Sequence, residues 1–194
     1  MSMNGVKLGF AMCGSFCTFS KAISQISALK NEGAEIIPIM SEMAYSTDTR
    51  FGTAEKFRKE ICDICGITED EIINSIVKAE PIGPKKMLDL LIIEPCTGNT
   101  LAKLANGIAD SSVTLAAKAH LRNDRPILIA VSSNDGLAAA ARNIGTLQNR
   151  KNFYFVPYSQ DDCLSKPTSL VAEFNKTVLA AKLALQNKQL QPIL

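Results

Sequence analysis

Four short segments carry the side chains best suited to binding chemistry. Each is rich in Gly, Ser, Thr or Asn, and each follows an apolar run: residues 13–15, 41–42, 97–100 and 132–134. Glycine permits tight turns, and hydroxyl and amide groups supply hydrogen-bond donors. The first turn of a helix that follows such a segment adds free N–H groups and a partial positive charge. The pattern predicts a site for a phosphate or a similar anion without a lysine cluster.

The segment CTGNT at 96–100 is the most informative of the four. It lies between the apolar run LLIIEP and the helical pattern LAKLANG. Thr97 or Asn99 could simply cap the following helix, because Thr and Asn are common N-cap residues. Four polar segments that each follow a predicted strand favour ligand binding over capping alone.

Two common nucleotide-binding motifs are missing. The chain contains neither G-x-G-x-x-G nor G-x-x-x-x-G-K-[ST], so NAD(P) binding of the usual kind and P-loop hydrolysis are disfavoured. Cys62 and Cys65 have the C-x-x-C spacing of redox and zinc sites. A zinc site needs about four ligands, and His120 is the sole histidine. We therefore expect partly buried helix thiols and no metal site.

The elements that must position these segments alternate along the chain. Apolar runs predict strands at 6–12, 34–40, 87–93, 127–131 and 153–156, the second imperfect because of Pro38. Helical spacing predicts helices at 16–31, 53–65, 68–78, 99–109, 111–121, 135–149 and 169–187, with loops at 41–52, 79–86, 132–136 and 160–168. This order predicts an α/β fold, a Rossmann-like or flavodoxin-like three-layer sandwich with a parallel sheet. Ligands of such sheets bind at the carboxyl ends of the strands, where the four segments would meet.

The composition fits one domain spanning residues 1–194, with a polar, mobile tail from about 187. Apolar residues make up 46%, charged residues 21%, and the net charge is +2, which indicates neither nucleic-acid nor membrane binding. The N-terminus lacks a signal-peptide pattern, and no apolar run reaches the ~18 residues of a membrane span. We expect a soluble, cytoplasmic protein whose six cysteines are reduced.

The motif at 95–110 resembles that of a known family. PCTGNTLAKLANGIAD is similar to the P-x-S-A-N-T-x-A-K-x-A-x-G-I-A-D segment of the flavoprotein family, which includes phosphopantothenoylcysteine decarboxylase, the lantibiotic cysteine decarboxylases and the flavin prenyltransferases. MCGSF at 12–16 adds to the likeness. The matching positions are Pro95, Thr97, Asn99, Thr100, Ala102, Lys103, Ala105, Gly107, Ile108, Ala109 and Asp110.

The resemblance implies an FMN pocket built by the four polar segments. Gly14 and Ser15 would face the phosphate or the ribityl chain, and Ser41 would close the pocket from the second segment. The phosphate and the ring edge would be held by Thr97, Gly98, Asn99 and Thr100, and the ring would be flanked by Ser132, Ser133 and Asn134. The resemblance also implies a homo-oligomer, a trimer or a dodecamer, in which a neighbouring copy of the chain completes the pocket.

The second half of the chain narrows the resemblance to one branch of the family. VSSNDGLAAAARNIGTLQNRKNFYFVPYSQDD at 131–162 and KPTSLVAEF at 166–174 are similar to the flavin-fold subunit of a synthase of spore-forming bacteria. This implies an oxidoreductase in the mother-cell cytoplasm that acts with a separate NADP-binding subunit to form a pyridine dicarboxylate. A substrate with two carboxylates needs cations. Arg50 and Arg142 are the candidates, unless both are solvated surface arginines.

Departures from the family keep two alternatives open. The chain lacks the P-x-M-N-x-x-M-W segment and catalytic histidine of the decarboxylases, and no arginine lies near Ser132 as in the prenyltransferases. The catalytic residues therefore stay unknown. The alternatives are an independent FMN-dependent decarboxylase and a non-catalytic scaffold subunit. Cys96 is either a redox-active thiol beside the flavin or a small residue packed under the loop, and we expect packing.

Overall fold

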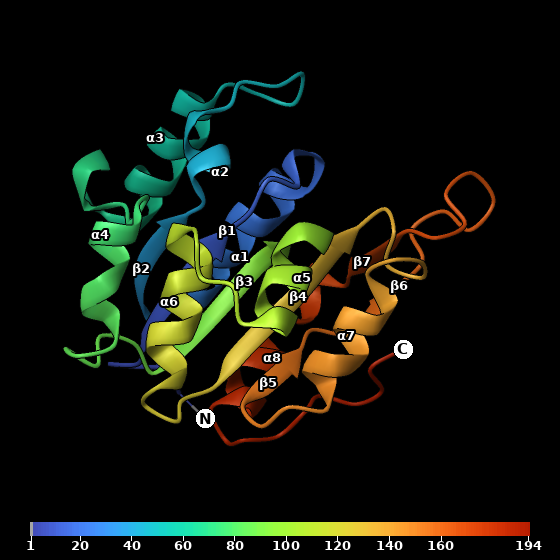
Figure 1. Ribbon diagram of the computed structural model, residues 1–194. Coiled ribbons are helices and arrows are strands. Elements are labelled where there is room, and N and C mark those ends of the chain that lie inside the picture. The colour runs from blue at the N-terminus through green and yellow to red at the C-terminus, as the bar shows by residue number, and fades with distance from the viewer. Residues whose placement is uncertain (1) are drawn as a thin grey trace.

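A seven-stranded sheet runs through the centre of the computed structural model, which describes residues 2–194 (Figure 1). Its parallel part has the order β2 (Glu35–Met40), β1 (Lys7–Met12), β3 (Leu90–Cys96), β4 (Ile127–Ser133), β5 (Phe153–Phe155). This is the flavodoxin-like order, with its switch point between β1 and β3. The central strands β3 and β4 are buried along their whole length, as expected for strands covered on both faces. The predicted fold class is confirmed.

Helices cover both faces of the sheet (Figure 1). One face is covered by α1 (Phe19–Asn31) and α8 (Thr177–Ala184), with α3 (Ala54–Cys65) packed on α1; the other is covered by α5 (Gly98–Asn106), α6 (Ser112–Leu121) and α7 (Ala141–Gln148). Helix α1 buries Phe19, Ile23 and Ile26, which share one helical face. Gly66 and Gly107 end α3 and α5 in the left-handed conformation.

The sheet is mixed, which corrects the prediction of a parallel sheet. Two short strands, β6 (Tyr158–Ser159) and β7 (Leu170–Ala172), pair with each other antiparallel, and β7 also pairs antiparallel with the end of β4. The predicted helix at 169–187 is therefore wrong in its first part. Helical structure begins only with a 3₁₀ turn at Phe174–Lys176. Strand pairing with Ser132 and Ser133 outweighs the helical spacing of the sequence.

The segment between β2 and β3 also differs from the prediction. The polar loop at 41–52 contains a short helix, α2 (Glu42–Ser46), and the predicted helix at 68–78 is absent. In its place stand a 3₁₀ turn (Glu69–Glu71), an extended stretch and α4 (Ile76–Ala79), followed by a 3₁₀ turn at Glu80–Ile82. The predicted capping box forms, but Ile73 then donates to Pro38 and accepts from Met40 on β2. These two bonds cover the sheet edge and stop the helix.

The last residues lie against the sheet. Gln189 accepts a hydrogen bond from Phe155 N–H at 2.8 Å and donates to Phe155 C=O at 2.7 Å. Tyr158 N–H donates to Ile193 C=O. The segment expected to be a mobile tail therefore caps the edge strand β5. Within residues 2–194, none of the helices has the length and apolar character needed to cross a bilayer.

Candidate functional site

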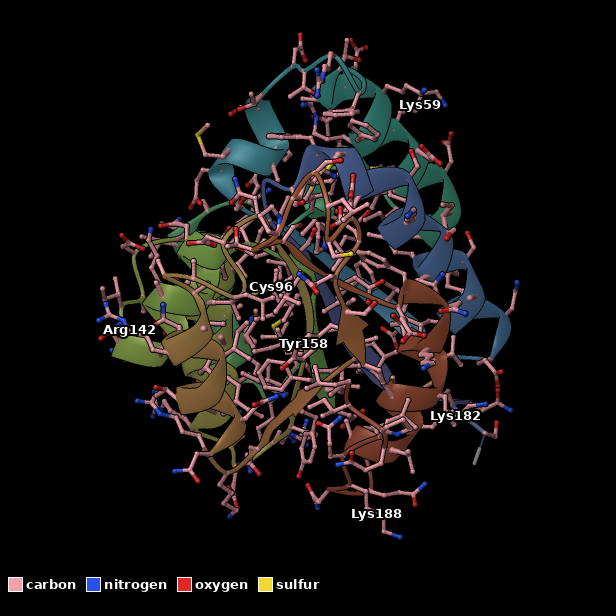
Figure 2. The ribbon with its side chains drawn as sticks, turned by 90° about the vertical axis from the view of Figure 1, so that its right-hand side faces the viewer. Lys59, Cys96, Arg142, Tyr158, Lys182 and Lys188 are labelled. Atoms are coloured by element: carbon pink, nitrogen blue, oxygen red, sulfur yellow. The ribbon has the colours of Figure 1, made fainter. Side chains whose placement is uncertain are left out.

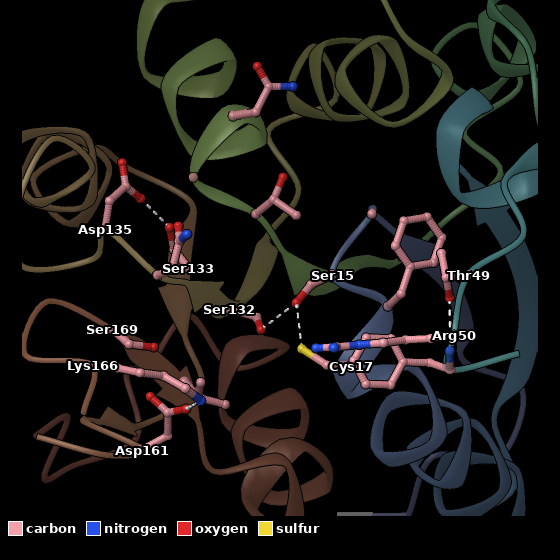
Figure 3. Close-up of a pocket in the computed structure, with 18 residues that line it drawn as sticks. Ser15, Cys17, Thr49, Arg50, Ser132, Ser133, Asp135, Asp161, Lys166 and Ser169 are labelled. Atoms are coloured by element: carbon pink, nitrogen blue, oxygen red, sulfur yellow. Dashed lines mark hydrogen bonds and ion pairs between the residues drawn. The ribbon is translucent and has the colours of Figure 1, made fainter. Parts of the chain in front are cut away.

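A pocket of about 870 Å³ lies at the carboxyl ends of β1, β3 and β4 (Figure 3). Three of the four predicted segments meet there, as the strand order requires. They contribute eight of the predicted residues: Gly14, Ser15, Thr97, Gly98, Asn99, Ser132, Ser133 and Asn134. A second hollow of about 480 Å³ adjoins the first and shares Gly14, Thr97 and Asn99 with it. Ser41 and Thr100, the other two predicted residues, line this second hollow.

The N-terminus of α5 opens onto both hollows. Thr97 caps the helix, because its Oγ1 accepts from Thr100 N–H at 3.3 Å. The capping interpretation is thus correct for Thr97. The N–H groups of Gly98 and Asn99 lie in the first turn and have no partner within the helix. The exposed Asn99 side chain stands beside them, so this turn offers an anion three donors.

Gly98 is required by a close approach of two loops. A Cβ at this position would lie 2.7 Å from Ser133 Oγ and 2.7 Å from Asp135 Oδ1. Ser133 donates a short hydrogen bond to Asp135. The glycine therefore lets the loop after β4 lie directly against the N-terminus of α5.

Hydroxyl groups join the loops after β1 and β4. Ser15 Oγ lies 2.8 Å from Ser132 Oγ, and Thr18 Oγ1 donates to Ser15 C=O at 2.8 Å. Figure 3 shows the two serines meeting in the middle of the pocket, with Cys17 beside them. These contacts fix the pocket floor, so its polar groups need little reorganisation on binding.

The second hollow has a tightly connected wall. Ser41 caps α2 by accepting from Ala44 N–H at 3.2 Å, and its own N–H donates to Met12 C=O at 2.9 Å. Thr100 Oγ1 donates to Cys13 Sγ at 3.2 Å. Burial raises the pKa of the Cys13 thiol to about 11, so this thiol stays protonated at neutral pH.

The two predicted substrate arginines have different outcomes. Arg50 lines the main pocket, and its guanidinium lies 4.9 Å from the centre of the Phe51 ring. Arg142 lines neither hollow; it is exposed on α7, and Figure 2 shows it at the outer surface. The predicted helix at 135–149 begins only at Ala141, and Asn143 and Ile144 take its buried face. We therefore withdraw Arg142 as a substrate residue.

One wall of the pocket consists of residues that were not predicted from the sequence. Asp135 belongs to the loop after β4, whereas Asp161, Lys166 and Ser169 come from the segment between β6 and β7. Lys166 Nζ lies 2.9 Å from Asp161 Oδ2. Asp161, Lys166 and Ser169 fall within stretches that carry the family resemblance, YSQDD and KPTSLVAEF. Their place in the pocket depends on β7 pairing with β4, which the helical pattern concealed.

The remaining candidate side chains lie away from both hollows. Cys96 is fully buried in the interior (Figure 2), as expected of a packed residue, and burial raises its pKa well above the usual value. His120 is fully buried, with Nε2 2.9 Å from Pro126 C=O, and burial lowers its pKa to about 4. Cys62 and Cys65 are half-buried on α3, where burial raises the pKa of both thiols. Within residues 2–194, no three metal-binding side chains gather.

The chain is similar to known proteins over most or all of its length. The model of the family described as "Flavoprotein" matches residues 1–179. The B subunit of dipicolinate synthase from Bacillus subtilis (strain 168) is 45% identical over 193 residues, which cover 100% of this chain and 95% of that protein. The crystal structure of the dipicolinate synthase B subunit from Bacillus halodurans C has a TM-score of 0.90 at 39% identity and covers 100% of this chain and 97% of that one.

A more distant structure shares the fold alone. The FMN-dependent cysteine decarboxylase SpaF has a TM-score of 0.68 at 21% identity, over 96% of this chain and 99% of that one. The pocket therefore lies in a fold that also serves decarboxylases, while the two closer similarities are both to B subunits of dipicolinate synthase.

Proposed function

As this chain belongs to the flavoprotein family, we propose that it is the FMN-binding B subunit of a dipicolinate synthase. It acts with the NADP-binding A subunit of that enzyme to oxidise dihydrodipicolinate, or its precursor, to dipicolinate during sporulation. Its proposed location is the mother-cell cytoplasm of a spore-forming bacterium. The observation that carries the proposal is full-length similarity to such a B subunit combined with one pocket that collects the TGNT and SSN segments.

The pocket residues fit FMN in size and in chemistry. The main pocket and the adjoining hollow, at about 870 and 480 Å³, are of the size range of cofactor sites. The N–H groups of Gly98 and Asn99, in the first turn of α5, suit a phosphate. Ser41 and Thr100 would hold the phosphate end, while Ser132, Ser133 and Asn134 would lie along the ring.

In the proposed reaction, the cofactor and different residues of the pocket would have separate roles. FMN, when bound, would supply an acceptor for the hydride that the dihydro ring loses on aromatisation. The hydroxyl pair Ser15 and Ser132 would orient the bound groups from the floor, because each is already fixed by the other. Arg50 would attract a substrate carboxylate, since its guanidinium has no carboxylate partner among residues 2–194. NADP would be held by the A subunit.

Independent decarboxylation is the weaker proposal. The family's decarboxylases use a catalytic histidine, and the single histidine of this chain is His120. His120 is buried against Pro126 C=O and lines neither hollow. A substrate in the pocket would have no imidazole within reach. The position of His120 therefore does not support decarboxylation by the histidine route of the family.

The test is reconstitution of the two-subunit enzyme. We expect dipicolinate to form from its dihydro precursor when both subunits and NADP⁺ are present, measured by chromatography. Asn99→Ala should lower the rate by about tenfold or more, because it removes a ligand donor in an exposed position. Asn106→Ala at the other end of α5 is the matched control and should keep the rate. Full activity of Asn99→Ala, with assembly intact, would instead support a scaffold role.

Homo-oligomerisation is a further part of the proposal. Ile108 is 47% exposed beside an apolar groove between α5 and α6 that also includes Leu104 and Leu121. An exposed apolar groove of this kind is suited to contact with another copy of the chain. Light scattering of the purified chain should give the mass of a trimer or a dodecamer; a monomer at all concentrations would refute this part.

A further inference from the structure

Two cations reach the main pocket from opposite sides. Arg50 comes from the turn after α2, and Lys166 comes from the segment between β6 and β7 (Figure 3). Within residues 2–194 they are the only Lys or Arg side chains that line this pocket. Among residues 2–194, Lys166 is therefore the cation that can complement Arg50 within the main pocket.

The segment that carries Lys166 is held by its own hydrogen bonds. Asp162 Oδ1 accepts from Ser165 N–H at 2.9 Å, and Lys166 N–H donates to Asp162 C=O at 2.8 Å. Gln160 Nε2 donates to Pro167 C=O at 2.8 Å. The backbone around Lys166 is therefore fixed before any ligand binds.

The ammonium group of Lys166 already binds a carboxylate. Its Nζ lies 2.9 Å from Asp161 Oδ2, and the two side chains are 57% and 30% exposed. A hydrogen bond from Ser169 and the pairing with Lys166 hold the pKa of Asp161 below its usual value. Asp161 thus places an ionised carboxylate at the pocket wall, within reach of a ligand. Replacing Asp161 by another carboxylate costs Lys166 little free energy, because half-exposed ion pairs are weak.

Arg50 is held by a closed turn and by an aromatic ring, and it has no carboxylate partner among residues 2–194. Its turn is closed by Thr49 and Gly52, which bond to each other through both backbone groups at 3.0 and 3.1 Å. The side chain lies against the Phe51 ring and is exposed. A planar guanidinium without a carboxylate partner can bind an incoming carboxylate through two parallel hydrogen bonds.

We propose that Lys166 exchanges its ion pair with Asp161 for one carboxylate of a planar dicarboxylate, while Arg50 binds the other carboxylate. This rests on the proposed function and deepens it, because it assigns Lys166 and Asp161 to substrate selection. Asp161 acts as the competitor: it holds Lys166 when the pocket is empty, and only a ligand with a second carboxylate displaces it. A monocarboxylate binds Arg50 and leaves the Lys166–Asp161 pair intact.

The first test compares two probes by calorimetry: pyridine-2,6-dicarboxylate and pyridine-2-carboxylate, titrated at neutral pH into the FMN-incubated chain. We expect the dicarboxylate to bind about tenfold or more tightly, since one added charge-assisted contact has that order of effect. Lys166→Met should reduce this preference to near one. Lys59→Met, which breaks a comparable exposed pair with Asp63 at 2.7 Å on α3, should keep it. An unchanged preference in Lys166→Met, or no dicarboxylate binding by the unaltered chain, overturns the proposal.

The second test uses Asp161, where a substitution should strengthen dicarboxylate binding, not weaken it. Asp161→Asn keeps an acceptor for Ser169 but removes the competing charge, so dicarboxylate binding should become several-fold tighter. If the ion pair merely holds the segment in place, Asp161→Asn and Lys166→Met would weaken binding alike, and the proposal fails. Asp63→Asn is the matched control and should leave both affinities unchanged.

Flavin absorbance of the same samples separates this inference from the proposed function. Flavin retained with a preference independent of Lys166 overturns the inference and leaves the FMN role standing. A preference that depends on Lys166 in a chain without flavin supports the dicarboxylate site and removes the FMN role.

Discussion

Among single residues, Gly98 offers the sharpest test of the loop arrangement. Gly98→Ala should displace Ser133 and Asp135, because the added Cβ would lie 2.7 Å from each, and unfolding free energy should fall by about 1 kcal/mol. FMN retention should fall with it. At Gly145 on α7, an added Cβ would meet no neighbouring heavy atom within 4 Å. Gly145→Ala should therefore raise the unfolding free energy by about 0.5 to 1 kcal/mol. Urea denaturation measures the unfolding free energy of both variants. Equal changes at the two positions would contradict the close approach of the two loops at Gly98.

His120 should make the protein less stable in acid. Burial lowers its pKa from 6.5 to about 4, and Nδ1 has no partner among residues 2–194. Between these values the unfolded chain takes up a proton that the folded chain does not. Unfolding free energy should therefore fall by about 3 kcal/mol from pH 7 to pH 4, and this contribution stays constant below pH 4. His120→Gln should show a flatter profile in denaturation across this range; parallel profiles would refute the assignment.

The predictable part of the site consists of residues whose role is local. Thr97 caps α5, and Gly98 begins that helix, so the motif alone placed them at a strand end. Lys166 and Asp161 were not predictable, because their position depends on β7 pairing with Ser132 and Ser133 about 38 residues earlier, as the register Ser133–Leu170 shows. Arg142 lies on the exposed face of α7 and lines neither hollow, because Asn143 and Ile144 take the buried face of that helix.

Among the elements, β3 and α8 are joined by a buried carboxyl group. Glu94 is fully buried on β3, Thr177 donates to its Oε2 at 2.8 Å, and Oε1 has no partner among residues 2–194. Burial raises the pKa of Glu94 well above 4.5. The folded chain thus keeps a proton that the unfolded chain releases, and this contribution to stability is lost as pH rises above 4.5.

Glu94→Gln tests this contact. The amide keeps an acceptor for Thr177 and cannot ionise, so the variant should gain stability relative to the unaltered chain as pH increases from 5 to 8, by up to about 1 kcal/mol per pH unit. Melting temperatures across this range measure the difference. The exposed Glu60→Gln should change nothing with pH. A constant difference between Glu94→Gln and the unaltered chain would contradict the buried, protonated state.

The elements also show where sequence patterns suffice. Five parallel strands were predicted from apolar runs alone, since central strands such as β3 and β4 are buried on both faces. The predicted helix at 68–78 failed because Ile73 pairs with the edge strand β2. Such pairings join residues distant in sequence, and no local pattern encodes them.

At the scale of the whole molecule, the chain closes on itself through Gln189. Its side chain accepts a hydrogen bond from the Phe155 N–H and donates one to the Phe155 C=O. Gln189 thus makes the hydrogen bonds that a neighbouring strand would make beside β5. Gln189→Ala should lower unfolding free energy by about 1 to 3 kcal/mol, because it leaves buried backbone groups unpaired. Gln191→Ala, at an exposed position, should have little effect. Equal urea midpoints for the two variants would show that the last residues do not support the sheet.

At the scale of the whole molecule, one large pocket lies where the strand order predicts a ligand. We propose that this pocket holds FMN. The most direct measurement is the visible absorbance of the purified chain after incubation with excess FMN and gel filtration. We expect flavin to co-elute with the protein, in an amount that Gly98→Ala reduces. A colourless protein peak with all flavin in the free fraction would contradict this proposal and would favour redox chemistry on the proposed NADP-binding subunit.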